Sequence, residues 1–102
     1  MKEINSYPLV AAPERAAKIR DGFLQVRAGM SPAEVMAILG EPDEIHPLYE
    51  PRVKSAEVIG CTHWYVIRRL AKHGSVDEKQ ESLVRVSYSL NDRVSKIDAW
   101  GL

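Results

Sequence analysis

The segment Val26–Pro42, VRAGMSPAEVMAILGEP, decides the fold, because almost every residue in it has a structural role. Ser31 is placed to cap a helix, the proline after it suits the first helical position, and Glu34 completes an S-x-x-E capping box. Gly40 suits the left-handed backbone conformation that ends many helices, and Pro42 prevents continuation. The segment therefore predicts a loop, a capped helix and a helix stop, in that order.

Upstream of this segment, a first helix is predicted from about Pro13 to Leu24, and Gly22 can break it near its end. Proline suits the first turn of a helix, and Glu14 favours its positive end. Residues 1–12 show no clear period, so we expect an irregular N-terminal arm followed by one domain over 13–102. The apolar side chains expected on one face of this helix are Ala12, Ala16, Ile19 and Phe23.

Downstream of Pro42 the hydrophobic period shifts toward two, which is typical of strands. Three strands are predicted, within 61–71, 82–90 and 93–100, and a short fourth one is an option at 43–46. Asn91 and Asp92 both tolerate positive φ, so they predict a tight turn between the last two strands. This order predicts an α+β fold, with two helices on one face of a three- or four-stranded antiparallel sheet.

The alternation of side chains predicts which residues face the helices. It is clearest in the strand at 82–90, whereas in the last strand Val94 needs a bulge to turn inward. The residues of these two strands expected in the core are Val84, Val86, Tyr88, Leu90, Ile97 and Ala99.

The first strand is harder to assign. Trp64, Val66 and Leu70 form the stronger core set, although the residues at 67 and 68 fit this phase badly. A slip of one residue would exchange Trp64 with Tyr65. With the first assignment, the open face of the sheet mixes aromatic and charged side chains, the types that dominate protein interfaces. The residues predicted to bind a partner there are His63, Tyr65, Arg69, Arg85, Lys96, Asp98 and Trp100.

Composition narrows the classes of function. The 102 residues carry 14 basic and 14 acidic side chains, so no global field favours nucleic acid or an anionic membrane as a partner. Cys61 is the single cysteine, which fits a reducing compartment. Polar residues interrupt the first 20 positions, and no segment has the ~18 apolar residues of a membrane span. We therefore expect a cytoplasmic protein.

The chain resembles the SmpA/OmlA-type, or BamE-like, domain over roughly residues 20–100. This is the fold of a small lipoprotein of the outer-membrane barrel-assembly machinery and, as a tandem pair, of secreted β-lactamase inhibitor protein. The resemblance implies a two-helix, antiparallel-sheet scaffold that typically binds proteins and does not catalyse reactions. The residues that carry it are the motif GMSxxEVxxxLGxP, formed by Gly29-Met30-Ser31, Glu34-Val35, Leu39-Gly40 and Pro42, followed by Trp64-Tyr65 and Asn91-Asp92.

The chain also departs from those relatives. The lipoproteins carry a signal peptide and a lipid-bearing cysteine near the start, and neither pattern is present in this sequence. The secreted inhibitors have two domains with disulfides, whereas one cysteine cannot form an internal bridge. The resemblance therefore predicts the fold more directly than the function.

Catalytic and metal-binding patterns are weak. Cys61 and His63 would share one face of a strand, with His46 and His73 as further ligands, but no C-x-x-C or H-x-x-x-H spacing supports a metal site. The carboxylates at Glu41 and its neighbours suit an exposed turn, and the sequence has neither a nucleophile signature nor a phosphate-binding loop. We expect no catalytic residue, no metal and no cofactor.

Three hypotheses of function follow. The first is an adaptor, inhibitor or immunity-type protein that presents the open sheet face and the loop at 46–60 to one protein partner. The second is a small-ligand pocket between helices and sheet, lined by Phe23, Trp64 and Tyr88. The third is a homodimer formed through an edge strand or the N-terminal arm.

Overall fold

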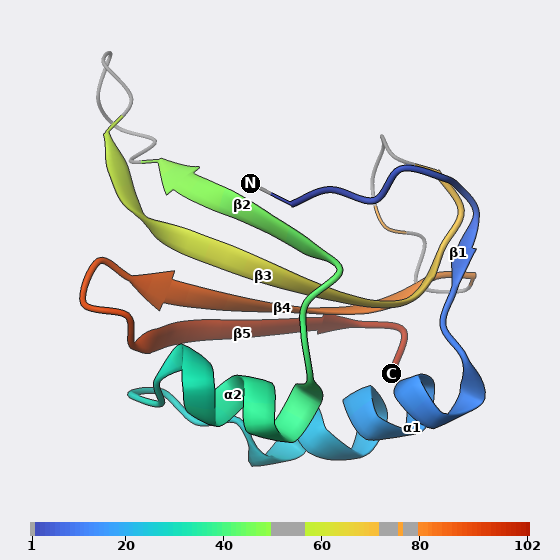
Figure 1. The fold of residues 1–102 in the computed structure, drawn as a ribbon, viewed down its shortest axis with the longest axis horizontal. Coiled ribbons are helices and arrows are strands. Elements are labelled where there is room, and N and C mark those ends of the chain that lie inside the picture. Colours follow the sequence, from blue (N-terminus) through green and yellow to red (C-terminus); the bar gives the residue numbers. More distant parts are fainter. Residues whose placement is uncertain (1, 50–56, 72–75, 77–79) are drawn as a thin grey trace.

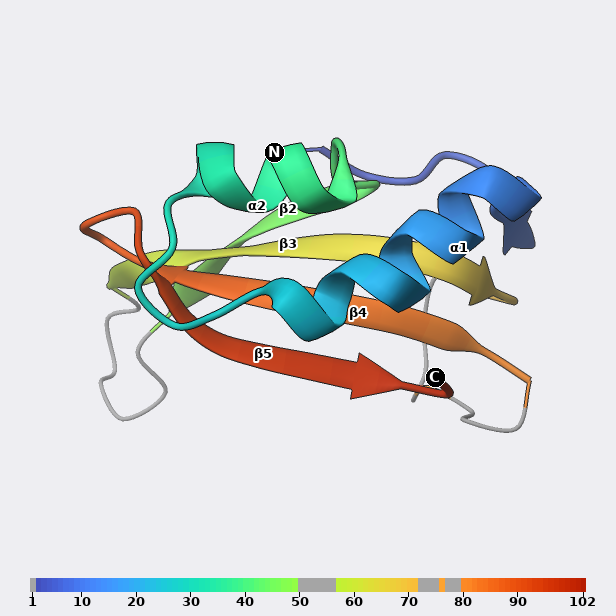
Figure 2. The ribbon, with the colours of Figure 1, turned by 90° about the horizontal axis from the view of Figure 1, so that it is seen from below.

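The fold is a two-layer α+β arrangement, in which two helices cover one face of a five-stranded antiparallel sheet (Figures 1 and 2). The computed structural model describes residues 2–49, 57–71, 76 and 80–102. The sequence-based α+β prediction is confirmed, although the sheet has more strands than predicted. The elements are β1 (Leu9–Val10), α1 (Pro13–Gly22), the 3₁₀ turn η1 (Phe23–Gln25), α2 (Pro32–Leu39), β2 (Glu44–Tyr49), β3 (Val58–Arg69), β4 (Ser82–Ser89) and β5 (Val94–Trp100).

The capped helix α2 is confirmed in detail. The Ser31 hydroxyl accepts a hydrogen bond from the Glu34 amide at 3.2 Å, and the Glu34 carboxylate accepts one from the Ser31 amide at 3.1 Å. Gly40 ends the helix with φ of 83°. Val35 and Leu39 are fully buried against the sheet. The predicted cap, stop and apolar face are therefore all present.

Helix α1 ends at Gly22, where the sequence allowed a break, and continues as the single turn η1 instead of reaching Leu24 as α-helix. Gly22 is in close contact with α2, because a Cβ added there would lie 2.9 Å from side-chain carbons of both Ile38 and Leu39. The glycine thus lets the two helices approach each other closely. Ile19 is fully buried beneath them.

The sheet order is β1-β3-β4-β5, with β2 pairing the same edge of β3 as β1 but further along it. Strand β2 extends to Tyr49, beyond the 43–46 predicted. The arm, predicted to be irregular, pairs with the sheet at two points. Its Leu9–Val10 form β1 opposite Arg68 and Arg69, and Lys2 forms an antiparallel bridge with Ile45.

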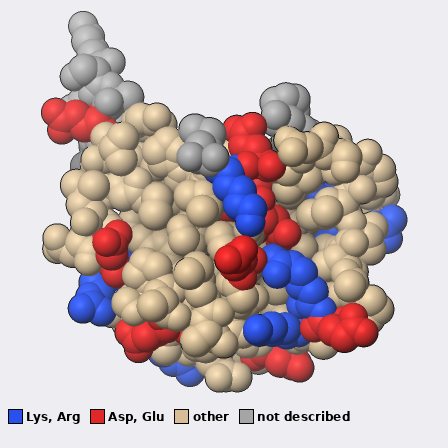
Figure 3. Space-filling model, viewed as in Figure 1, with Lys and Arg blue, Asp and Glu red and all other residues tan. Residues whose placement is uncertain are grey.

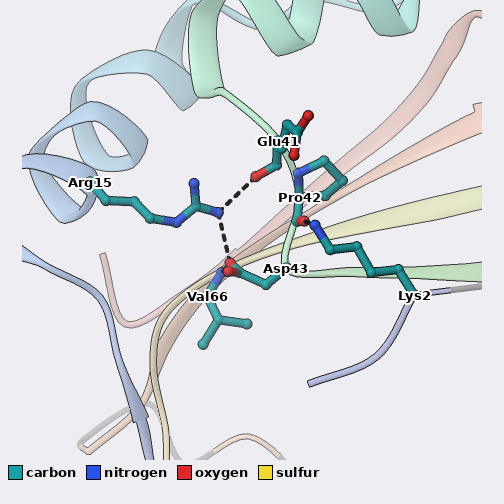
Figure 4. A network of polar contacts seen from close by, with 6 residues as sticks. All are labelled: Lys2, Arg15, Glu41, Pro42, Asp43 and Val66. Atoms are coloured by element: carbon teal, nitrogen blue, oxygen red, sulfur yellow. Dashed lines mark hydrogen bonds and ion pairs between the residues drawn. The ribbon is translucent and has the colours of Figure 1, made fainter. Parts of the chain in front are cut away.

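Asp43 fills the gap that β1 and β2 leave on the edge of β3 (Figure 4). On β3, the pairing with β2 ends at Trp64, opposite Glu44, and the pairing with β1 starts only at Arg68, so the Val66 amide between them faces neither strand. The Asp43 carboxylate accepts a hydrogen bond from that amide at 2.7 Å. Arg15 of α1 bonds the same carboxylate oxygen at 2.9 Å. Asp43 thereby fixes the start of β2 to both layers.

The first predicted assignment of β3 is wrong, and the alternative with a one-residue slip is the one observed. Tyr65 faces the helices and is fully buried, opposite Val84, whereas Trp64 lies on the other face opposite Arg85. The pairing with β4, whose alternation is unambiguous, sets this phase. Ile67, which fitted the first phase badly, packs in the core with Tyr65, and a bulge between Val66 and Arg68 then shifts the register.

The predicted facing of β4 and β5 is confirmed for most residues, but Ala99, predicted in the core, is exposed although it lies opposite Val84 on the helix side. Val84, Val86 and Tyr88 are fully buried beneath the helices. A bulge opposite the start of β5 turns Val94 inward to 3% exposure, as the sequence required. Asp92 in the connecting turn has φ of 54°. Leu90, predicted in the core, is instead 69% exposed because it already belongs to the turn.

Candidate binding groove

Four of the seven predicted partner-binding residues lie together on the face of the sheet that the helices leave open. Arg85 of β4 is directly opposite Asp98 of β5, and Lys96 lies opposite Ser87 in the next pair on the same face of the sheet. Trp100 lies close enough for its indole ring to contact the Arg85 guanidinium, 4.7 Å from the ring centroid. This part of the predicted surface is therefore assembled as expected.

The other three predicted residues are not available to a partner. His63 and Tyr65 face the helices and are 8% and 0% exposed, because the β3 phase is the slipped one. Burial lowers the pKa of His63 and raises the pKa of Tyr65 to about 12. Arg69 is 4% exposed and forms an ion pair with Glu81 at 3.6 Å. Their assignment to a binding surface is wrong.

The open face contains a groove of about 450 Å³ that spans strands β2 to β5. Its residues form two parallel rows across the strands, because each pair is in register. All residues of both rows line the groove except Glu44, which lies at the end of the first row. The first row is Glu44, Trp64, Arg85 and Asp98, and the second is His46, Thr62, Ser87 and Lys96; Pro47, Leu48 and Ser95 complete the lining.

An aromatic stack holds Arg85 in the groove. The guanidinium carbon lies 3.7 Å from the Trp64 ring centroid and 4.7 Å from that of Trp100, so the cation lies between two indoles. The His46 ring contacts Trp64 in turn, with centroids 4.9 Å apart. Cation–π contacts of this kind stabilise a guanidinium by roughly 0.5–2 kcal/mol each, depending on desolvation. The side chain is thus held in place before any partner binds.

Glu44 fixes one end of the groove and links it to the N-terminal arm. Its carboxylate is buried and accepts hydrogen bonds from the Ile4 amide at 3.0 Å and the Tyr7 hydroxyl at 3.4 Å. The other carboxylate oxygen contacts His46 Nε2 at 3.2 Å. Burial, reinforced by the charge of Glu44, raises the pKa of Tyr7. The arm therefore orients His46, which in turn contacts Trp64.

Three buried polar atoms of the groove residues have no hydrogen-bond partner within the described part of the chain: Thr62 Oγ1, Trp64 Nε1 and Arg85 Nε. Buried polar groups are paired in most native structures, so each exception calls for an explanation. Burial lowers the pKa of Arg85, with nearby Arg69 acting in the same direction, while Asp98 and Glu44 oppose the shift. Lys96 by contrast contacts Asp98 at 3.6 Å.

Sequence reasoning missed Trp64, Thr62 and His46 as groove residues. Trp64 was assigned to the core because both phases of β3 contain aromatic and β-branched side chains. The poor fit at 67 and 68 was the signal for the other phase. His46 could not be placed without the extent and register of β2, which pair it with Thr62.

The predicted pocket between helices and sheet does not form from its three residues. Tyr88 is fully buried and Phe23 packs against the same core, whereas Trp64 lies on the opposite face. The metal hypothesis loses its ligand set in the same way, because Cys61 and His63 lie on the helix side and His46 in the groove. His73 lies outside the described residues. Over 2–49, 57–71, 76 and 80–102, no three His, Cys, Asp or Glu side chains gather as a metal site.

The molecular surface agrees with the balanced charge of the chain. Figure 3 shows acidic and basic side chains interleaved across the view of Figure 1, without a large patch of one sign. Neither helix of the described chain is both long enough and apolar enough to pass through a membrane.

No family model matches the sequence, and no curated protein sequence matches it significantly. The structure is similar to the crystal structure of OsmE, described as an osmotically inducible lipoprotein, with 25% sequence identity, 87% of each chain covered and a TM-score of 0.51. This comparison shows nothing of a β-lactamase inhibitor repeat. It also gives no support to a cytoplasmic location, which stays a prediction. The chain has the SmpA/OmlA-type, BamE-like fold, with two helices on an antiparallel sheet and a groove on its open face.

Proposed function

We propose that this protein is a small, non-enzymatic protein-binding module that presents its open-face groove to one protein partner, as an adaptor, inhibitor or immunity-type protein. The observation that carries the proposal is the Arg85 guanidinium held between Trp64 and Trp100. Tryptophan and arginine are the residue types most enriched among energetically dominant interface positions. Here Trp64 and Arg85 line a groove of about 450 Å³, and Trp100 contacts Arg85 beside it.

The rigidity of the stack supports this reading. Residues on paired strands are held more precisely than residues on loops, and ordering costs fall when a binding side chain is already fixed. Trp64 and Arg85 are a register pair of β3 and β4, the two strands at the centre of the sheet. The similarity to OsmE adds that the fold belongs to a lipoprotein-type scaffold.

The test is capture of a partner by matched variants. The immobilised wild-type protein, Arg85→Gln and Trp100→Ala are each incubated with native lysate, and bound proteins are identified by mass spectrometry. Leu24→Ala is the control, because Leu24 is 64% exposed on η1, on the helix side of the molecule. Circular dichroism and thermal melting verify that every variant is folded.

We expect a protein that the wild type and Leu24→Ala both retain and that Arg85→Gln and Trp100→Ala lose. Central interface residues of these types typically contribute 2 kcal/mol or more, which is roughly a 30-fold loss of affinity. Equal retention by folded groove variants and by the control contradicts the proposal.

Self-association is a second candidate, favoured by the edge of β5. Among the described strands, β5 pairs only with β4. Val94 at its start bonds the backbone of Gly29 and Met30, so the outer edge beyond Val94 presents the backbone groups that a second copy could pair. Sedimentation equilibrium at increasing protein concentration tests this candidate. A monomer mass at every concentration refutes it.

The cytoplasm is the location proposed for this function, because the single cysteine, Cys61, is free. Cell fractionation with an antibody against the protein tests it. Recovery in the membrane fraction would place the protein with the lipoproteins that share its fold.

A further inference from the structure

We infer that the open-face groove binds a carboxylate, namely an aspartate or glutamate side chain within an extended segment of the protein partner. This inference rests on the proposed function and deepens it, because it names the chemical group that the groove recognises. It is carried by three buried hydrogen-bond donors that have no partner within the described residues, by a cation that forms no ion pair there, and by the dimensions of the groove.

The unpartnered atoms specify an acceptor. Trp64 Nε1 and Arg85 Nε can only donate hydrogen bonds, and the Thr62 hydroxyl can also donate. Thr62 is 7% exposed, so its hydroxyl has little access to bulk water although it lines the groove. A ligand rich in acceptor oxygens would satisfy these donors, whereas a ligand that brings only donors would leave Trp64 Nε1 and Arg85 Nε buried and unpaired.

The charges around the groove favour a ligand group with a single negative charge. Lys96 and Asp98 are paired with each other at 3.6 Å, and His46 contacts Glu44 at 3.2 Å. Arg85, by contrast, makes no ion pair within the described residues, although Asp98 and Glu44 act on it at longer range. A carboxylate matches this one cation. A dianionic phosphate group would bring a second negative charge close to both acidic side chains.

The stack presents Arg85 in a form suited to a carboxylate. The guanidinium carbon lies over the Trp64 and Trp100 rings, 3.7 and 4.7 Å from their centroids, and the edge of a planar guanidinium matches a carboxylate with two parallel hydrogen bonds. The lining spans four strands, which at about 4.8 Å per strand spacing is roughly 14 Å across. That width, with apolar Pro47 and Leu48 on one wall, accommodates an extended segment on either side of the acidic residue.

Tryptophan fluorescence and indole NMR signals report directly on this groove. The chain contains two tryptophans, and both flank Arg85. The probe is a capped peptide with one glutamate between leucines, compared with the same peptide carrying glutamine. Inorganic phosphate is the third ligand. Binding is measured by titration of the two indole N–H resonances, with Trp64→Phe used to assign them.

We expect the glutamate peptide to shift both indole resonances and the glutamine peptide to bind about tenfold more weakly, because it loses the charge assistance of the hydrogen bonds. Phosphate is expected to bind more weakly than the glutamate peptide. Arg85→Gln is expected to abolish the preference for glutamate, and Arg85→Lys to weaken binding about tenfold, because lysine keeps the charge but loses the planar fork. Arg68→Gln is the matched control, since Arg68 is an exposed cation on β3 that faces the helix side.

The outcomes separate this inference from the proposed function. Equal binding of the two peptides, tighter binding of phosphate, or an unchanged preference in folded Arg85→Gln overturns the carboxylate inference. If a captured partner still depends on Trp100 but acidic peptides do not displace it, the protein-binding function stands and the carboxylate inference fails. If the glutamate peptide binds but groove variants capture partners normally, the carboxylate site stands and the proposed function fails.

Discussion

Replacement of Asp43 by alanine should destabilise the protein far more than the partial exposure of this residue suggests. Asp43 accepts a 2.7 Å hydrogen bond from the Val66 amide at the gap between β1 and β2. Val66 is fully buried, so no water can readily replace the lost acceptor. Arg15 would also lose its ion pair, although its bond to the Glu41 carbonyl would remain. Figure 4 shows how these contacts converge on the start of β2.

The expected loss of stability in Asp43→Ala follows from these two contacts, with the Val66 amide and with Arg15. A buried amide left without its charged acceptor costs about 1.5–3 kcal/mol. The ion pair adds only about 0.5 kcal/mol, because the Arg15 and Asp43 side chains are 30% and 20% exposed and solvent screens them. Asp43→Ala should therefore lower the free energy of unfolding by about 2–3 kcal/mol. For a domain of this size, the melting temperature should fall by roughly 10–20 °C.

Urea unfolding followed by circular dichroism measures the loss, and Asp43→Asn and Arg15→Ala separate its two parts. Asp43→Asn keeps an oxygen acceptor for the Val66 amide and should cost about 1 kcal/mol. Arg15→Ala should cost less than about 1 kcal/mol. The reasoning is refuted if Asp43→Ala is no more destabilising than Asp43→Asn, or if the Val66 amide exchanges with solvent equally slowly in both variants.

Three further predictions follow from burial and register. Tyr65→Ala should cost about 3–5 kcal/mol of stability as a core truncation, and Trp64→Ala only about 1–2 kcal/mol; chemical denaturation giving the reverse order would contradict the β3 phase. Gly60→Ala should prevent normal pairing of β3 with β4, because a Cβ would collide with the Tyr88 carbonyl oxygen; a native melting temperature and NMR spectrum would refute this. Burial lowers the pKa of His63 in the folded state below 6.5, so the unfolded chain binds more protons and stability should fall as the pH drops through 6.5. His63→Phe should remove this slope in pH-dependent melting, and an unchanged slope would assign the effect to other groups.

Local rules in the sequence were sufficient for the helices and for two strands. The contacts of Ser31 with Glu34, and the positive φ of Gly40, depend only on residues within one helical turn. The sequence pattern was therefore enough to predict both of them. Strand β4 was equally readable, because its apolar and polar residues alternate from Val84 to Ser89. Leu83 is also apolar, but it faces away from the helices. The bulge that turns Val94 inward was expected from the facing of the residues within β5 itself.

The candidate site was only partly predictable. Arg85, Lys96, Asp98 and Trp100 belong to strands with a readable phase, and these four lie on the open face. The phase of β3 was ambiguous, because residues of both parities are apolar or aromatic. The hydrogen-bond register with β4 decides the phase of β3, because a shift of one residue would move every β3 side chain to the opposite face of the sheet. The binding roles of the four open-face residues remain predictions.

By itself the sequence VRAGMSPAEVMAILGEP determined a capped helix and, through the resemblance it carries, a two-layer α+β scaffold, because caps, stops and periodicity act between near neighbours. Only the tertiary structure decided that Trp64 and not Tyr65 faces the groove, and that Arg85 lies between two indoles. The physical reason is that the pairing of β3 with β4 joins residues 14 to 29 positions apart in the sequence. A shift of one residue in that pairing leaves local propensity unchanged, while it exchanges the buried face for the open one.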